Sequence, residues 1–128
     1  MSIRVQPQGE AVVVTAERRL VVGNRQALKA AVLLELDNGR PAVVIDFHDT
    51  ELIDSGGLGV LVTLYRHAEE KGARFVLANL SDELTGLMRL TKLDTILKLA
   101  DSIESALGEG PAAGPPFDTE PQQALSSI

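Results

Sequence analysis

The chain has 128 residues, of which 45% are hydrophobic and 23% are charged, and its formal net charge is -6 at pH 7. This composition is that of one soluble domain large enough to bury a core, and the excess of acidic residues argues against direct binding to nucleic acid or to an anionic membrane surface. Because the sequence has no cysteine, no apolar run as long as a membrane span and no N-terminal secretion signal, we expect a cytoplasmic protein without a disulfide framework or a thiolate metal site.

The first predicted element is a hairpin of two strands, at residues 3–5 and 11–16. Both runs are rich in β-branched residues, and the stretch between them contains the turn formers Pro7 and Gly9. Strands joined by so short a connection pair antiparallel. We therefore expect an antiparallel hairpin at one edge of a sheet.

A helix and a buried strand are predicted next. Asn24 is a good N-cap, apolar residues recur at helical spacing as far as Leu36, and residues 37–39, Asp-Asn-Gly, end the helix. The run Ala-Val-Val-Ile at residues 42–45 is typical of a strand that is covered on both faces. We therefore place this strand at the centre of the sheet.

The second half of the chain continues the alternation of helix and strand. Apolar residues at helical spacing predict a helix that begins at or near Ser55 and ends at Gly72. Residues 74–78 predict the next strand, and Ser81 followed by two acidic residues predicts the cap and first turn of another helix. Connections of this length join parallel strands with a right-handed crossover.

Near the end of this alternation we predict a last strand at residues 95–99 and a short helix from a cap at Asp101 to Leu107. The predicted fold is α/β: a single domain over residues 1–108, with a mixed sheet of four to five strands, an N-terminal antiparallel hairpin and helices packed on the sheet. Residues 109–128 lose periodicity and are rich in proline and glycine, so we expect a disordered tail there.

The sequence ELIDSGGLGV at residues 51–60 is compatible at first sight with several kinds of chemistry. A trypsin-like protease needs a histidine and an acid beside Ser55, but neither His48 nor His67 has a convincing third partner, and the chain is too short for two β-barrels. An aspartic protease would use Asp54 in a carboxylate pair. That fold is almost all β, and its aspartate loop does not lead into a long helix as this stretch does. A phosphate-binding loop would need a glycine spacing or a lysine that this stretch lacks. We therefore expect no catalytic residue and no enzymatic activity.

Two compatible roles remain open for Ser55. Its hydroxyl is expected to cap the helix by accepting a hydrogen bond from a first-turn N–H, which contributes about 1 kcal/mol. Gly56, Gly57 and Gly59 each cost up to ~1 kcal/mol relative to alanine in a helix, so we expect a partner to need a bare, accessible backbone there. A hydroxyl at a helix start among small residues is also a good target for a protein kinase, and a phosphate would add about -1.5 to -2 charges.

The chain resembles the STAS domain family, in particular bacterial anti-sigma factor antagonists, from about Ile3 to Leu107. The resemblance is concentrated in VVIDFHDTELIDSGGLGVLV at residues 43–62, where the family typically shows an apolar strand ending in Asp, a short loop and Asp-Ser-Ser/Thr-Gly-Leu-Gly before a helix. A second similar stretch covers residues 69–97. The resemblance implies a STAS-like fold, in agreement with the architecture predicted above.

By this resemblance, Ser55 is the serine that a cognate anti-sigma factor serine kinase phosphorylates. The residues implied in partner binding are Asp54, Gly56, Gly57, Leu58 and Gly59. Gly56 replaces a second hydroxyl residue common in the family, which leaves Ser55 as the only acceptor in the motif core. Asp46, at the end of the central strand, either lines the same partner-binding surface or caps a loop.

The resemblance further implies partner switching. The unphosphorylated protein would bind an anti-sigma factor that is also an ATP-dependent kinase, phosphorylation would release it, and a PP2C-type phosphatase would reset the cycle. ATP and metal would belong to those enzymes, and this chain would bind no cofactor and be a monomer or weak dimer. Val21 stands where the family often has a partner-facing acid, while Arg18 and Arg19 are either a contact for an acidic partner or a solvated strand end. The alternative function is a non-phosphorylated STAS interaction module in a signalling scaffold or transporter complex.

Overall fold

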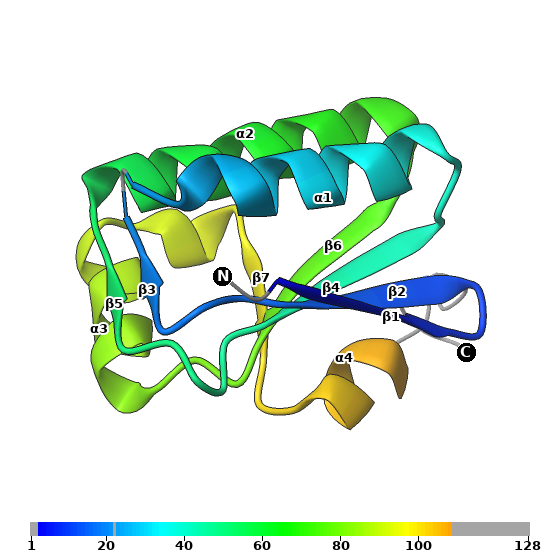
Figure 1. Ribbon diagram of the computed structural model, residues 1–128. Coiled ribbons are helices and arrows are strands. Elements are labelled where there is room, and N and C mark those ends of the chain that lie inside the picture. The colour runs from blue at the N-terminus through cyan, green and yellow to red at the C-terminus, as the bar shows by residue number, and fades with distance from the viewer. Residues whose placement is uncertain (1–2, 22, 109–128) are drawn as a thin grey trace.

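The computed structural model describes residues 3–21 and 23–108, so the predicted tail at 109–128 lies outside the described part of the chain. The main strands are β1 (Arg4–Gln8), β2 (Ala11–Thr15), β4 (Ala42–Asp46), β6 (Arg74–Ala78) and β7 (Lys98–Ala100). They form one five-stranded sheet in the order β1-β2-β4-β6-β7 (Figure 1). β1 and β2 pair antiparallel and the other neighbours pair parallel, which confirms the predicted mixed sheet with an N-terminal hairpin.

The helices that the structure describes cover the two faces of this sheet unequally. They are α1 (Arg25–Asp37), α2 (Ser55–Lys71), α3 (Asp82–Leu90) and α4 (Ile103–Gly108), with a 3-10 turn at Leu93–Thr95. α1 and α2 lie side by side over one face, whereas α4 packs on the opposite face (Figure 1). A separate parallel pair, β3 (Arg19–Leu20) and β5 (Leu52–Ile53), lies at the end of the molecule where α2 begins (Figure 1).

The alternation of side chains along β4 explains why helices pack on both faces. Every residue of β4 is buried, and the strand lies between β2 and β6, so the predicted central strand is confirmed. Val43 and Ile45 belong to the larger core under α1 and α2, and Val44 belongs to the smaller core that includes Ala106 of α4. Since successive strand residues point to opposite faces, one apolar run supplies both cores.

The first and last predicted strands differ from the structure by more than one residue. The first strand runs through Pro7, and the chain turns at Gly9, whose φ of 66° lies in the left-handed region that glycine favours. Proline is tolerated because β1 is an edge strand, where one side needs no backbone donor. The last strand begins at Lys98 rather than at residue 95, because residues 93–95 form a 3-10 turn and the next two N–H groups bond back to it.

Of two predicted helix caps, Asn24 is correct in position but makes no capping bond, and Asp101 is wrong. Asn24 precedes α1, but its side-chain oxygen accepts a hydrogen bond from the N–H of Val21 at 3.0 Å and makes no capping bond to the helix. The Asn24 side chain thus holds the loop before α1. At the start of α4, the hydroxyl of Ser102 accepts a hydrogen bond from the N–H of Ser105 at 3.0 Å, so Ser102 caps that helix instead of Asp101.

Asp37, at the end of α1, connects α1 to α2. Its carboxylate accepts a hydrogen bond from Nε2 of His67 at 2.8 Å and lies 3.5 Å from Nζ of Lys71. The hydrogen bond from His67 lowers the pKa of Asp37, the charges of His67 and Lys71 lower it further, and desolvation opposes them. Because its pKa is lower in the folded chain, the Asp37 carboxylate stabilises the fold above the pKa of the unfolded chain, and this contribution is lost as the pH falls through the folded value.

Replacing Asp37 by asparagine should therefore destabilise the protein at about pH 6 and have a smaller effect below about pH 3. Urea denaturation of the parent protein and the variant at both pH values measures the difference. Glu69→Gln, which removes an exposed carboxylate from α2, is the matched control and should change stability little at either pH. A loss of stability that is equal at both pH values would contradict the role assigned to the Asp37 carboxylate.

Candidate functional site

The candidate site is the start of α2, where β5 leads into the helix (Figure 1). Asp54 has an extended backbone, and its Oδ1 accepts a hydrogen bond from the N–H of Gly57 at 2.8 Å. Asp54 is therefore the N-cap, and Ser55 is the first helical residue, which confirms where the helix begins. The prediction that Ser55 caps the helix is wrong, because the residue before it supplies the capping oxygen.

Ser55 is exposed, and its hydroxyl has no hydrogen-bond partner in the part of the chain that the structure describes. Both histidines are bonded elsewhere, His48 to Asp46 and His67 to Asp37, each at 2.8 Å. Within the described residues, neither histidine hydrogen-bonds the Ser55 hydroxyl, as a general base for this serine would. The hydroxyl faces solvent at a helix start, where the active site of another protein can reach it.

Gly57 is buried at the centre of the motif. A Cβ atom at this position would overlap the backbone carbonyl oxygen of Leu20 and lie 2.9 Å from Cγ2 of Ile53. β3 and β5 therefore pack so closely under α2 that only glycine fits without a shift of the backbone. This corrects the expectation that Gly57 offers an accessible backbone to a partner. Gly57 is buried, and glycine is required there by the internal packing against Leu20 and Ile53.

The two neighbouring glycines have different surroundings. Gly59 is exposed, and a Cβ atom there would meet nothing within 4 Å. A Cβ atom on Gly56 would instead overlap the guanidinium of Arg25, the first residue of α1. Arg25 was not among the residues that we predicted for the site, because it lies outside the motif and only the packing of α1 against α2 brings it there.

The pair β3 and β5 fixes the position of the helix start. The N–H of Asp54 donates to the carbonyl oxygen of Leu20 at 3.1 Å, and the N–H of Glu51 donates to that of Arg18 at 2.7 Å. The side chains of Arg18 and Glu51 also form an exposed ion pair at 3.1 Å, which adds little stability. Arg18, just before β3, and Arg19, the first residue of β3, are both exposed, while the strand supports the start of α2.

The profile of STAS domains matches residues 2–106. The chain belongs to the STAS domain family. A Thermotoga maritima protein named as a candidate anti-sigma factor antagonist is 30% identical over 101 residues, which are 78% of this chain and 89% of that protein. The crystal structure of a candidate anti-sigma factor antagonist from the same organism is 27% identical and has a TM-score of 0.75, covering 84% of this chain and 92% of that one.

The phosphorylated Bacillus cell fate determinant SpoIIAA has a similar fold, with a TM-score of 0.66, 19% sequence identity, and coverage of 84% of this chain and 98% of that one. SpoIIAA has also been solved unphosphorylated, with a TM-score of 0.68 and 18% identity over 80% of this chain and 91% of that one. At these identities the likeness concerns the fold alone, and it supports the STAS architecture described above.

In this STAS domain, Asp46 ends the central strand and organises the loop that follows. Its side chain is 6% exposed and accepts hydrogen bonds from the N–H of His48 at 3.0 Å, from Nδ1 of His48 at 2.8 Å and from Nδ2 of Asn79 at 2.9 Å. Of the two roles considered for Asp46, the structure shows the loop cap. The His48 side chain is 52% exposed, so any contact of this cluster with a partner would involve His48 first.

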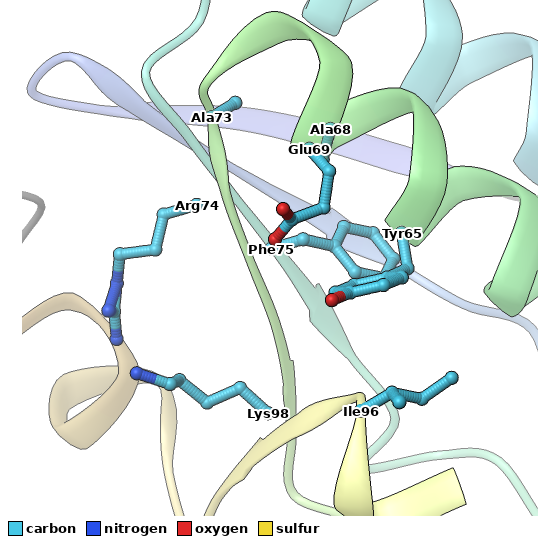
Figure 2. Close-up of a pocket in the computed structure, with 8 residues that line it drawn as sticks. All are labelled: Tyr65, Ala68, Glu69, Ala73, Arg74, Phe75, Ile96 and Lys98. Atoms are coloured by element: carbon cyan, nitrogen blue, oxygen red, sulfur yellow. The ribbon is translucent and has the colours of Figure 1, made fainter.

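A pocket of about 220 Å³ lies further along α2, lined by residues of α2, β6 and the segment around β7 (Figure 2). Arg74 and Lys98 extend on one side of it, and Tyr65 and Ile96 lie on the other (Figure 2). Tyr65 is ten residues beyond Ser55, about 15 Å along the helix, so this pocket is separate from the helix start. Within residues 3–21 and 23–108, no cluster of three metal-ligating side chains occurs, and no helix is long and apolar enough to cross a membrane.

Proposed function

We propose that this protein is an anti-sigma factor antagonist that binds an anti-sigma factor serine kinase while Ser55 is unphosphorylated and dissociates after Ser55 is phosphorylated. The observation that supports it most directly is the state of Ser55, an exposed hydroxyl at the first residue of α2 with no partner among the described residues. Asp54 supplies the cap, so the Ser55 hydroxyl can be modified without removing a bond that the helix needs. The chain is then a substrate and a ligand, and not an enzyme.

The phosphoryl transfer needs only the hydroxyl from this chain. Oγ of Ser55 attacks the γ-phosphorus of ATP, the new O–P bond forms as the bond to ADP breaks, and the hydroxyl proton passes to a base of the kinase. The product carries about -1.5 to -2 charges at a helix N-terminus, which favours anions, so the domain tolerates it. A partner docked over the helix start would instead meet a bulky, solvated anion and lose affinity.

The surface proposed to bind the partner surrounds Ser55, and its residues are unequally exposed. Ser55 and Gly59 are exposed, whereas Asp54, Gly56 and Leu58 are half-buried. Leu52, which precedes this surface on β5, is 50% exposed and can add an apolar contact. Gly57 supports the surface from beneath and does not form part of it.

Relatives named as anti-sigma factor antagonists support this assignment, as does the fact that SpoIIAA has been observed in phosphorylated and unphosphorylated forms. A protein that cycles between two such forms needs an enzyme to remove the phosphate, and we propose a PP2C-type phosphatase for that step. Under this proposal ATP and the catalytic metals are bound by the kinase and the phosphatase. This chain requires no cofactor of its own.

Incubation of the purified protein with its cognate anti-sigma factor kinase and ATP is expected to add one phosphate, and Ser55→Ala should abolish the incorporation. Intact-mass spectrometry measures the result, with Ser105→Ala as the matched control because Ser105 is an exposed serine on α4. Incorporation that persists in Ser55→Ala would refute the proposed acceptor. Stable partner binding without any phosphorylation would favour the alternative of a non-phosphorylated interaction module.

A further inference from the structure

Arg25 lies directly against the start of α2. A Cβ atom on Gly56 would overlap Nη1 of Arg25 and would lie 3.1 Å from its Cζ atom, so the guanidinium occupies the space that a side chain at position 56 would fill. The same Cβ position is 3.4 Å from Oδ1 of Asp54. The guanidinium therefore lies beside the residue that follows Ser55, on the side of the N-cap carboxylate.

Within the described residues, the N–H donors of the Arg25 guanidinium are not used by the fold. Among these residues the guanidinium forms no hydrogen bond and no ion pair, although other arginines of the chain, such as Arg18 and Arg40, pair with glutamates. Arg25 is also the first residue of α1, and α1 has no acidic residue in its first turn. A cation at a helix N-terminus is unfavourable, so the position of Arg25 at the start of α1 does not serve that helix itself.

We propose that Arg25 is the internal counter-charge for a phosphate on Ser55, and that its guanidinium lies in space that the absence of a side chain on Gly56 leaves open. This proposal rests on the phosphorylation of Ser55 argued above and adds the residue that receives the phosphate. Arginine suits the task because its planar guanidinium donates parallel hydrogen bonds to two phosphate oxygens. In the phosphorylated protein, Arg25 would hold the phosphate against α1 and offset the repulsion from Asp54.

The test uses protein in which phosphoserine is installed at position 55 during translation, so that no kinase is needed. Phosphorus NMR follows the last ionisation of the phosphate as the pH is raised. We expect the acid dissociation constant of the phosphate to be about threefold smaller in Arg25→Gln than in the parent protein, because the dianion loses the nearby positive charge of Arg25. The effect is modest because Arg25 is half-exposed and solvent screens its charge. Arg25→Lys, which keeps the charge but not the two parallel donors, should fall between them.

Two further variants separate this role from a general effect of charge or folding. Arg66→Gln removes an equal charge from an exposed position of α2 about 16 Å along the helix from Ser55, and it should leave the constant unchanged. Gly56→Ala should change the constant less than Arg25→Gln does, because the end of the flexible Arg25 side chain can shift away from one added methyl group and keep its charge near the phosphate. Circular dichroism checks that each variant is folded.

Equal constants in the parent protein and Arg25→Gln, or equal changes in Arg25→Gln and Arg66→Gln, would overturn the assignment of Arg25. If Arg25→Gln does not fold, the comparison of Arg25→Lys with the parent protein decides the question by the same titration. A kinase that ignores Ser55 would refute the proposed function but would not alter this titration. The two proposals therefore fail through different measurements.

Discussion

Replacing Gly57 by alanine is expected to lower the free energy of unfolding by about 3 kcal/mol, near the upper end of what overpacking costs. The added methyl group would overlap the carbonyl oxygen of Leu20 and crowd the side chain of Ile53. The obstructing atom at Leu20 belongs to the backbone of β3, which also pairs with β5, so relief requires a shift of β3 or of the first turn of α2. Urea denaturation followed by circular dichroism measures the loss.

Gly59→Ala is the matched control for Gly57→Ala. Gly59 lies two residues further along the same helix, and a methyl group there would meet nothing within 4 Å. Since alanine is the better helix former, this variant should be more stable than the parent protein by up to about 1 kcal/mol. Similar effects at the two positions would show that helix propensity, and not contact with Leu20, determines the result.

Ser55→Asp is expected to weaken binding of the anti-sigma factor kinase by on the order of 100-fold, about 2.7 kcal/mol. It places a permanent negative charge at the proposed docking surface, next to Asp54. A partner that fits the neutral hydroxyl must then desolvate this charge or lose its contacts around Ser55. Ser55→Ala adds no charge and should bind within a few-fold of the parent protein. Isothermal titration calorimetry with the kinase measures the three affinities.

The control for Ser55→Asp must separate the position of the charge from its effect on the whole protein, whose net charge is already -6. Ser105→Asp adds the same charge on α4, which packs on the face of the sheet opposite to α1 and α2 (Figure 1). It should leave the affinity nearly unchanged. Equal losses in Ser55→Asp and Ser105→Asp would mean that general repulsion, and not the helix start, controls binding.

Much of the fold could be predicted from the sequence because the relevant forces act between residues near one another in the chain. The apolar run at residues 42–45 identified the central strand, since a strand buried on both faces needs apolar residues at successive positions. Gly72 ends α2 with a φ of 70°, and the hydroxyl of Ser81 accepts a hydrogen bond from the N–H of Leu84, as their positions predicted. The motif likewise located the start of α2 at Ser55.

Only the tertiary structure decided what the individual residues of that motif do. The capping oxygen comes from Asp54 and not from Ser55, because the position of the helix boundary within one residue depends on how β5 is held by β3. Gly57 and Gly56 read alike in the sequence, yet Gly57 is confined by the backbone carbonyl oxygen of Leu20, whereas Gly56 borders the flexible side chain of Arg25. Both neighbours are distant in the chain, and close packing brings them to the helix start in a way that local periodicity does not encode.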